Sequence, residues 1–336
     1  MFVPLSIPSP SAAWQYFDVT AWLNSTFGAS LPGSLRIHAY AICILVGIVA
    51  AVVITNHRLN RQGAEKGIVI DVAIWAVVFG IAGGRLFHVI THPADYFSSP
   101  DQYIHVLFVW EGGLAIYGAL LLGAVGVWLG CRFTGLRFTV FADALAPGLL
   151  VAQAFGRLGN WFNHELFGMP TDLPWGLEIE STNAAYPTGL PEGTLFHPTF
   201  LYEIVWMLAG VAILVLLVLL EKKAPMQWGR SLAFYLVWYG IGRAWFESIR
   251  TDPSLLFFGI RTNVWMSFFA IVLGIVLFVL ASRRHTGTVP GPYVPGRAPS
   301  ERAAAVDSDG TYTENDEPEL VTVGASDDNT DRSPRP

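Results

Sequence analysis

The sequence has few charged residues and very few cysteines. Only 14% of its 336 residues are charged, whereas a soluble domain carries about 25%. Hydrophobic residues make up 53% of the chain and the mean hydropathy is +0.46, so the polar surface that a soluble protein of this length needs is missing. The composition excludes an ordinary soluble protein and predicts an integral membrane protein.

The cysteines and histidines do not indicate a disulfide framework or a metal site. Two cysteines cannot build such a framework, and Cys43 and Cys131 are expected near opposite faces of the membrane, too far apart to bridge. No CxxC pair occurs and the eight histidines are scattered along the chain. We therefore predict no metal and no cofactor, and nothing indicates nucleic-acid binding. The N-terminus lacks a basic region before a short apolar core, so no cleaved signal peptide is expected.

Hydrophobic runs long enough to cross a bilayer recur through the first 284 residues. A hydrocarbon core of about 30 Å needs roughly 20 apolar residues in a helix. The runs predict seven membrane helices, near residues 38–56, 68–92, 113–131, 138–157, 199–220, 230–250 and 263–282. Glycines interrupt several runs, as expected where helices pack closely in lipid. The predicted fold is an all-α membrane domain over residues 1–284.

The basic residues predict how this domain is oriented. They gather in the loops after the first, third, fifth and seventh spans, whereas the alternate loops contain no lysine and are mainly acidic. The positive-inside rule then places the N-terminus outside and the C-terminus in the cytoplasm. Residues 158–198 are expected to form a small external head. Residues 285–336 hold the whole net charge of −6 and predict a disordered, acidic cytoplasmic tail.

Polar side chains inside the predicted spans are the strongest sign of function. An arginine at the centre of a membrane helix costs about 2.5–3.5 kcal/mol on insertion scales, so such residues are functional candidates. Most of them fall in the outer half of the bilayer, and Asp143 is the exception. The outer-half candidates are Tyr40, Arg85, Tyr117, Arg157, His197, Glu203, Arg243, Glu247 and Arg250. Because arginine suits bidentate contact with phosphate, they predict one site for an anionic phospholipid.

Structural roles remain open for these residues taken singly. Arg85 or Arg261 can extend to the membrane interface, and Arg243 can have a purely structural role as the partner of Glu247.

Other classes of protein are considered next to the lipid site. A retinal-binding receptor is excluded because the last span has no lysine. A small transporter predicts polar residues through both halves of the bundle, and a lipid-binding protein without catalysis remains an alternative.

Several segments resemble the prolipoprotein diacylglyceryl transferases of bacteria, in the order of that family and over about residues 36–284. The longest is GRLGNWFNHELFG, from Gly156 to Gly168. The others are His38-Ala39-Tyr40-Ala41, Gly83-Gly84-Arg85, VWEGGLAIYG at 109–118, HPTFLYE at 197–203 and YGIGRAWFESIR at 239–250.

The resemblance implies an enzyme of the bacterial cytoplasmic membrane. Such enzymes transfer the diacylglyceryl group of phosphatidylglycerol to the lipobox cysteine of prolipoprotein signal peptides, the first step of lipoprotein maturation. A thioether forms and glycerol 1-phosphate leaves. A single bundle with an enclosed site is expected to work as a monomer.

The resemblance also implies roles for individual residues. Arg157 would bind the phosphate, Arg243 would act on the same phosphate or head group, and Glu247 would fix the rotamer of Arg243. The expected catalytic residues are Tyr40, Tyr117, Asn160, Arg243 and Glu247. The expected substrate-binding residues are Arg85, Arg157, Glu165, Gly168, His197, Glu203 and Arg250.

The main departure from the family pattern is Tyr117, where many members have histidine. A thiol with a pKa of about 8.5 must lose its proton to become the nucleophile, and a phenol is a poorer base than an imidazole. The base is left open between Tyr117, Glu203, a phosphate oxygen of the lipid, and thiolate formation near the arginines. Phe200 stands where the family often has glutamine, so that side chain is not expected to be required.

Overall fold

A computed structural model of the chain describes residues 6–220, 226–252, 254–285 and 287–301. The chain divides into two units, residues 1–294 and 295–336, and every element below belongs to the first. Its long helices are α2 (Ala39–Arg61), α3 (Ile68–Thr91), α5 (Ile116–Thr134), α6 (Phe138–Phe162), α7 (Thr199–Leu220), α8 (Arg230–Ile249) and α9 (Thr262–Arg284). Most of the predicted tail, and Lys222 and Lys223 of the basic loop after α7, lie outside the described residues.

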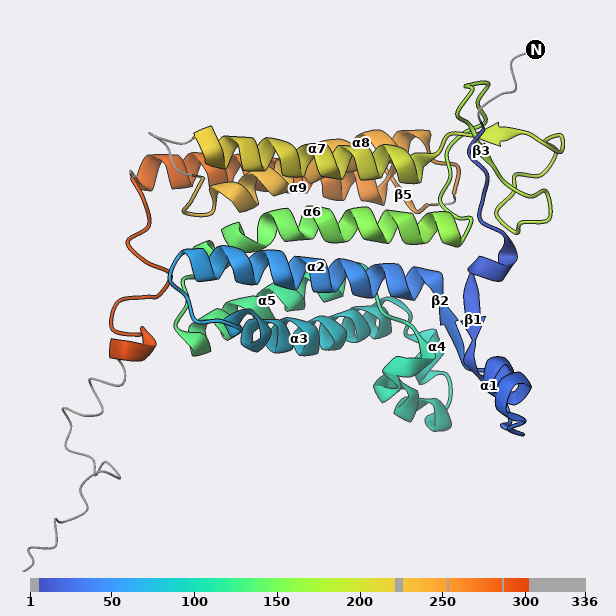
Figure 1. Cartoon of the computed structure of the whole chain (residues 1–336), viewed down its shortest axis with the longest axis horizontal. Coiled ribbons are helices and arrows are strands. Elements are labelled where there is room, and N and C mark those ends of the chain that lie inside the picture. The colour runs from blue at the N-terminus through green and yellow to red at the C-terminus, as the bar shows by residue number, and fades with distance from the viewer. Residues whose placement is uncertain (1–5, 221–225, 253, 286, 302–336) are drawn as a thin grey trace, which may run out of the picture. The chain divides into compact units, whose positions relative to one another are not determined.

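Short elements gather at one end of the long helices (Figure 1). In the described part of the chain the strands form antiparallel pairs: β1 (Tyr16–Asp18) with β2 (Arg36–His38), β3 (Leu177–Glu178) with β4 (Leu195–Phe196), and β5 (Leu256–Phe257) with β6 (Ile260–Arg261). The short helices are α1 (Val19–Phe27), α4 (Ala94–Phe97) and the 3-10 turns η1 (Ala12–Trp14), η2 (Pro100–Leu107) and η3 (Val109–Glu111).

Helix α6 lies at the centre of the bundle. It packs against α2 on one side and against α7 and α8 on the other, while α3 pairs with α5 and α8 with α9 (Figure 1). In α6, 56% of an apolar stretch of 18 residues is buried inside the protein. The corresponding share is 17% in α2 and in α9. Residues on α6 can therefore meet side chains from both halves of the bundle.

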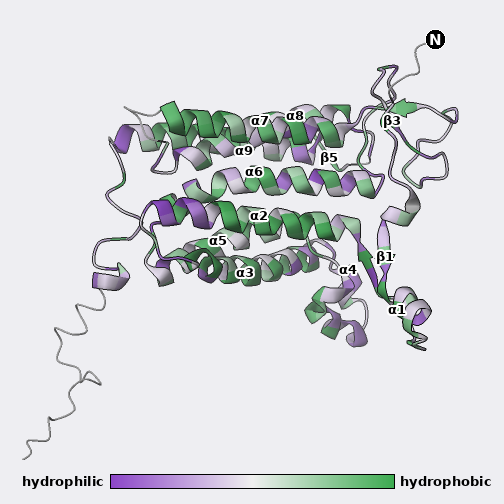
Figure 2. Ribbon diagram, viewed as in Figure 1, coloured by the Kyte–Doolittle hydropathy of each residue, from purple (hydrophilic) through white to green (hydrophobic). Residues whose placement is uncertain are grey.

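The outward faces of the helices are apolar, which identifies a membrane protein. Val49, Leu120 and Val272 are each about 60% exposed, and Figure 2 shows hydrophobic residues along the length of the helices. In water so large an apolar surface would drive aggregation. Six helices in the described part of the chain, α2, α3, α5, α6, α7 and α9, are long and apolar enough to cross a membrane. Helix α8, predicted as one of seven spans, is not among them, because its charged and aromatic residues lower its mean hydropathy.

The helix ends differ from the predicted spans by a few residues. Helix α5 begins at Ile116 and not at 113, because Gly112 and Gly113 both have positive φ, at 93° and 70°, and cannot continue a right-handed helix. Helices α2 and α6 continue five residues beyond the predicted 56 and 157, to Arg61 and Phe162. In α2 the added residues are mostly polar, His57, Arg58, Asn60 and Arg61, which a search for apolar runs does not count.

Glycines allow α3 and α5 to pack backbone against backbone, as the sequence predicted. A Cβ atom on Gly83 would overlap the carbonyl oxygen of Gly118, and one on Gly118 would overlap that of Gly83. Such close approach is the usual use of small residues between membrane helices. Cys43 and Cys131 are both buried and free, as expected.

Asp143, the one acidic residue predicted in the inner half, has a structural role. Its carboxylate accepts hydrogen bonds from the backbone N–H groups of Gly229, at 2.7 Å, and Leu232, at 3.1 Å. These are unpaired donors at the N-terminus of α8, so Asp143 on α6 caps a neighbouring helix.

The segment between α6 and α7 packs around an apolar cluster of its own. Phe167, Leu177, Ile179 and Phe196 are buried together. Backbone hydrogen bonds from Ile7 join the N-terminal segment to β3. The head predicted over 158–198 is thus a small packed unit that begins after α6 ends at Phe162.

Candidate active site

Arg157 lies near the end of α6 and forms an ion pair with Glu203 in the first turns of α7. Its Nε atom is 2.6 Å from Glu203 Oε2, and its Nη1 donates to Asn160 Oδ1 at 3.3 Å. The Glu203 side chain is 2% exposed and that of Arg157 18%. Because a guanidinium has five N–H donors, these two acceptors leave donors of Arg157 available for a further anion.

Asn160 links Arg157 to the loop that follows α6. Its Nδ2 donates to Glu165 Oε1 at 2.9 Å, and Asn163 Nδ2 donates to the same oxygen at 3.2 Å. In this loop His164 and Leu166 have positive φ, at 53° and 60°, which L residues rarely adopt. Strained backbone of this kind is often found at functional sites.

Tyr40 joins the same region from α2. Its ring packs on Gly159 of α6, where an added Cβ would come within 2.7 Å of the ring. Tyr40 therefore contacts the turn of α6 that also carries Arg157 and Asn160.

A second cluster surrounds Glu247, near the end of α8. Its carboxylate is 2.9 Å from Arg243 Nη2, 3.2 Å from Arg261 Nη1 and 3.7 Å from Arg250 Nη1. Asn263 Nδ2 donates to Glu247 Oε1 at 3.0 Å. The Glu247 side chain is fully buried. One carboxylate thus faces three guanidinium groups.

The positive charge of this cluster is only partly neutralised. Asp252 pairs with Arg250 at 2.6 Å, which leaves Arg243 and Arg261 to share Glu247. Arg243 Nη1 is buried, and no acceptor for it occurs in the described part of the chain. A buried donor on a cation without an acceptor is costly unless an anion binds there.

The two clusters interact electrostatically. The charge of Arg157 acts on Arg243 and Arg250, and that of Glu203 on Arg243 and Glu247. The predicted residues on α6, α7 and α8 therefore form one cationic region, called here the arginine site: Arg157, Asn160, Glu203, Arg243, Glu247 and Arg250.

Tyr117 reaches this region from the first turn of α5. Its hydroxyl donates to Asn263 Oδ1 at 2.7 Å, and its ring packs edge-on against Phe87. Tyr117 also interacts electrostatically with Arg243 and Glu247. The departure from the family's histidine therefore lies beside the arginine site.

Gly168 and His197 support the site through their backbones. The Gly168 N–H donates to His197 O at 3.0 Å, and Gly168 also forms an antiparallel bridge with Arg250. A Cβ on Gly168 would lie 2.7 Å from His197 Cβ and 3.0 Å from Ile249 O. Glycine is needed at position 168 because neighbouring atoms approach its Cα closely, and not because its φ is positive. The His197 ring contacts the hydroxyl of Tyr202 at 3.2 Å.

The structure does not bring Arg85 to the arginine site, where the sequence placed it. Its guanidinium donates to the backbone carbonyls of Val106, at 2.9 Å, Gly112, at 2.6 Å, and His105. It also lies over the ring of Tyr96, at 4.8 Å. These contacts fasten the segment around η2 and η3 to α3.

His88 and His92 have the HxxxH spacing of some metal sites, although the histidines were expected to be scattered. Their rings stack at 4.4 Å, and His88 Nδ1 contacts the hydroxyl of Tyr96 at 3.1 Å. Within the described residues, no group of three or more His, Cys, Asp or Glu side chains could hold a metal ion.

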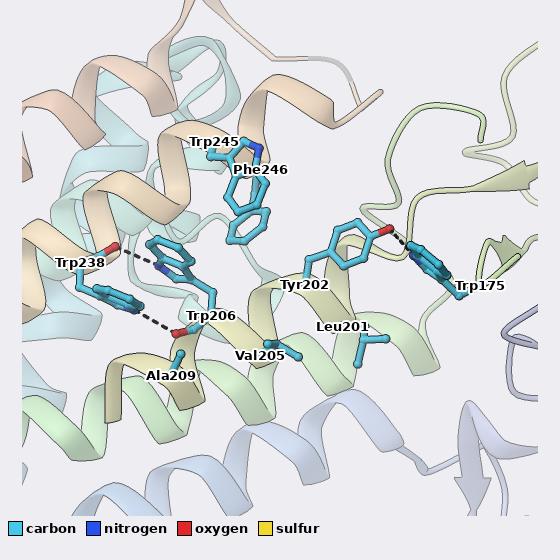
Figure 3. A pocket seen from close by; sticks show the side chains of 9 residues that line it. All are labelled: Trp175, Leu201, Tyr202, Val205, Trp206, Ala209, Trp238, Trp245 and Phe246. Carbon is cyan, nitrogen blue, oxygen red and sulfur yellow. Dashed lines mark hydrogen bonds between the residues drawn. The ribbon is translucent and has the colours of Figure 1, made fainter. Parts of the chain in front are cut away.

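An aromatic groove of about 500 Å³ runs along the seam between α7 and α8 (Figure 3). Trp206 and Trp238 stack at 4.2 Å, and each indole N–H donates to the backbone carbonyl of the other residue at 3.0 Å. Each indole also covers a glycine of the opposite helix, Gly242 or Gly210, where a Cβ would overlap it. This reciprocal contact fixes α7, which carries Glu203, against α8, which carries Arg243.

Two residues of the site, Asn263 and Arg261, were not predicted from the sequence as site residues. Asn263 is the first residue of the last predicted span, and Arg261 was expected to be able to extend to the membrane interface. Both lie where α9 begins, at one end of an apolar helix. A polar residue at the first position of a span was a signal, but its contact with Glu247 depends on how α9 packs against α8.

The fold and the site define a polytopic helical membrane protein with largely buried arginines grouped at the end of the bundle that carries the head. Comparison with known proteins narrows this class. The prolipoprotein diacylglyceryl transferase family matches residues 28–280 of the chain.

Curated relatives agree. A phosphatidylglycerol–prolipoprotein diacylglyceryl transferase of Leifsonia xyli is 54% identical over 316 residues, covering 92% of this chain and 90% of that protein. A second, from Streptomyces coelicolor, is 46% identical over 76% of this chain and 79% of its own length. One from Bifidobacterium longum is 45% identical over 76% and 84%. The chain belongs to the prolipoprotein diacylglyceryl transferase family.

Proposed function

We propose that this chain transfers the diacylglyceryl group of phosphatidylglycerol to the lipobox cysteine of prolipoproteins, the first step of lipoprotein maturation. The observation that carries the proposal is the arginine site, in which Arg157 and Arg243 lie together among apolar helices and Arg243 Nη1 has no acceptor in the described residues. Relatives of 54% and 46% identity are named for this reaction.

The reaction is a displacement at the glycerol carbon that bears the phosphate. The cysteine sulfur forms a bond to this carbon while the C–O bond to the phosphate breaks, and the oxygen keeps the electron pair. Negative charge therefore gathers on the departing glycerol 1-phosphate. Arg157 and Arg243 are proposed to stabilise this charge, because preorganised cations act most strongly where water is excluded.

The thiol proton must also leave. In the structure Glu203 and Glu247 each form an ion pair with an arginine. The departing phosphate gains a charge as the C–O bond breaks, so the released glycerol 1-phosphate is proposed to take up the proton. No cofactor enters this scheme.

The topology proposed is seven spans, with α8 as the sixth, the N-terminus outside and the C-terminus in the cytoplasm of a bacterial plasma membrane. The distribution of basic residues supports this orientation. Because Cys43 and Cys131 are buried, one cysteine introduced at exposed Ser181 would report on the head. In intact cells, a membrane-impermeant maleimide should label the Ser181→Cys variant. Labelling only after cell lysis would indicate the opposite orientation.

The function is tested with purified protein, phosphatidylglycerol and a lipobox peptide. Mass spectrometry should show the peptide gaining one diacylglyceryl group on its cysteine, and a peptide with serine at that position should gain none. Absence of product from folded protein would favour the alternative of a lipid-binding protein without catalysis. A monomer is expected in detergent.

A further inference from the structure

Three side chains from three helices form a directed chain of hydrogen bonds beside the arginine site. The hydroxyl of Tyr117, on α5, donates to Asn263 Oδ1 at 2.7 Å. Asn263, on α9, donates from Nδ2 to Glu247 Oε1 on α8 at 3.0 Å. Within the described residues, the first of these bonds joins α5 to α9.

The charge of Glu247 determines the direction of both bonds. Three guanidinium groups lie within 4 Å of this carboxylate, and guanidinium groups only donate, so Glu247 acts as a hydrogen-bond acceptor here. The amide of Asn263 must therefore turn its NH2 group towards Glu247 and its oxygen towards Tyr117. The Tyr117 hydroxyl then donates its single proton in the hydrogen bond to Asn263 Oδ1.

Tyr117 can consequently meet any other group only as an acceptor. Its ring is held against Phe87, and its hydroxyl lies close enough to Arg243 to interact electrostatically. The remaining lone pairs of the phenol oxygen are the part of Tyr117 left for a substrate.

Resting on the proposed function, we propose that Asn263 is a positioning residue that presents the Tyr117 oxygen as an acceptor for an X–H donor of a substrate. The donor is either the lipobox thiol or a glycerol hydroxyl of phosphatidylglycerol. In this arrangement Tyr117 orients the substrate by a hydrogen bond and does not remove its proton.

The same geometry explains which side chains can replace Tyr117. A neutral imidazole carries a donor on one ring nitrogen and an acceptor on the other, so it can donate to Asn263 and still accept from a substrate. Tyr117→His is therefore expected to keep most of the wild-type kcat/KM. Tyr117→Phe retains the ring but loses both the donor to Asn263 and the acceptor for a substrate.

The test measures kcat and KM for peptide and for phosphatidylglycerol in full-length protein. Loss of one hydrogen bond predicts that Asn263→Ala and Tyr117→Phe each lower kcat/KM by about tenfold. Because both changes remove the same oriented acceptor, the double variant should lose little more than either single one. Ser267→Ala is the matched control, since Ser267 donates to the backbone oxygen of Asn263 at 2.7 Å and leaves the side-chain chain intact.

The substrate whose KM rises identifies the donor, as thiol or as glycerol hydroxyl. Additive losses in the double variant would overturn the proposal. It would also be overturned if Asn263→Ala lowered the Tm but left kcat/KM of the folded protein unchanged. Wild-type protein assayed in parallel distinguishes failure of this proposal from failure of the proposed function. A wild type that forms no product contradicts the proposed function itself.

Discussion

Arg157→Ala is expected to lower turnover by about 100- to 1,000-fold, the usual effect of removing one preorganised group that stabilises transition-state charge. Arg157 is held by Glu203 and Asn160 with donors to spare, so its guanidinium is positioned before substrate binds. Alanine would remove that group and leave Glu203 as a buried carboxylate without its cation. The measurement is kcat with phosphatidylglycerol and a lipobox peptide.

Two variants make this result specific. Arg157→Lys keeps the charge but loses the planar fork, and it should recover only part of the activity. Arg36→Ala removes an exposed arginine that pairs with Asp18 at 3.7 Å, and its turnover should match the wild type. Near-normal turnover of Arg157→Ala would contradict the assignment of the phosphate to this residue.

Glu247→Ala is expected to lower the free energy of unfolding by about 3–5 kcal/mol, as when one partner of a buried ion pair is removed. Without this carboxylate, Arg243 and Arg261 lose their shared anion while they stay in an apolar bundle. The mutual repulsion of the guanidinium groups adds to the cost. The expected result is a large fall in Tm, measured in detergent.

Glu247→Gln and Asp252→Ala are the matched controls. Glutamine keeps the hydrogen-bonding shape without the charge, so its Tm should lie between those of Glu247→Ala and the wild type. Asp252 pairs with Arg250 at the edge of the site and is 26% exposed, so its loss should cost much less. Equal Tm values for Glu247→Ala and Asp252→Ala would show that Glu247 does not hold the cluster together.

The sequence predicted the contacts that depend on spacing along one helix. Arg243, Glu247 and Arg250 are four and three residues apart, a spacing that places them on one helical face, and the structure joins both arginines to Glu247. The apolar runs likewise predicted the long helices, because hydrophobic length is a local property.

Contacts between helices could not be predicted in the same way. The pairing of Arg157 with Glu203 and of Asn263 with Glu247 depends on how α7 and α9 pack, which no local pattern contains. Arg85 has the residue type expected of a lipid site, but the carbonyl groups around η2 and η3 occupy its donors. Residue type predicted which groups could bind an anion, and packing decides which of them have donors to spare.

The most direct test of the anion site is the lipid that the purified protein retains. Native mass spectrometry should show wild-type protein binding phosphatidylglycerol in preference to phosphatidylcholine, from vesicles that contain equal amounts of each. The Arg157→Ala/Arg243→Ala double variant should lose this preference, and Arg36→Ala should keep it. An unchanged preference in a folded double variant would contradict the account that these two arginines hold the phosphate.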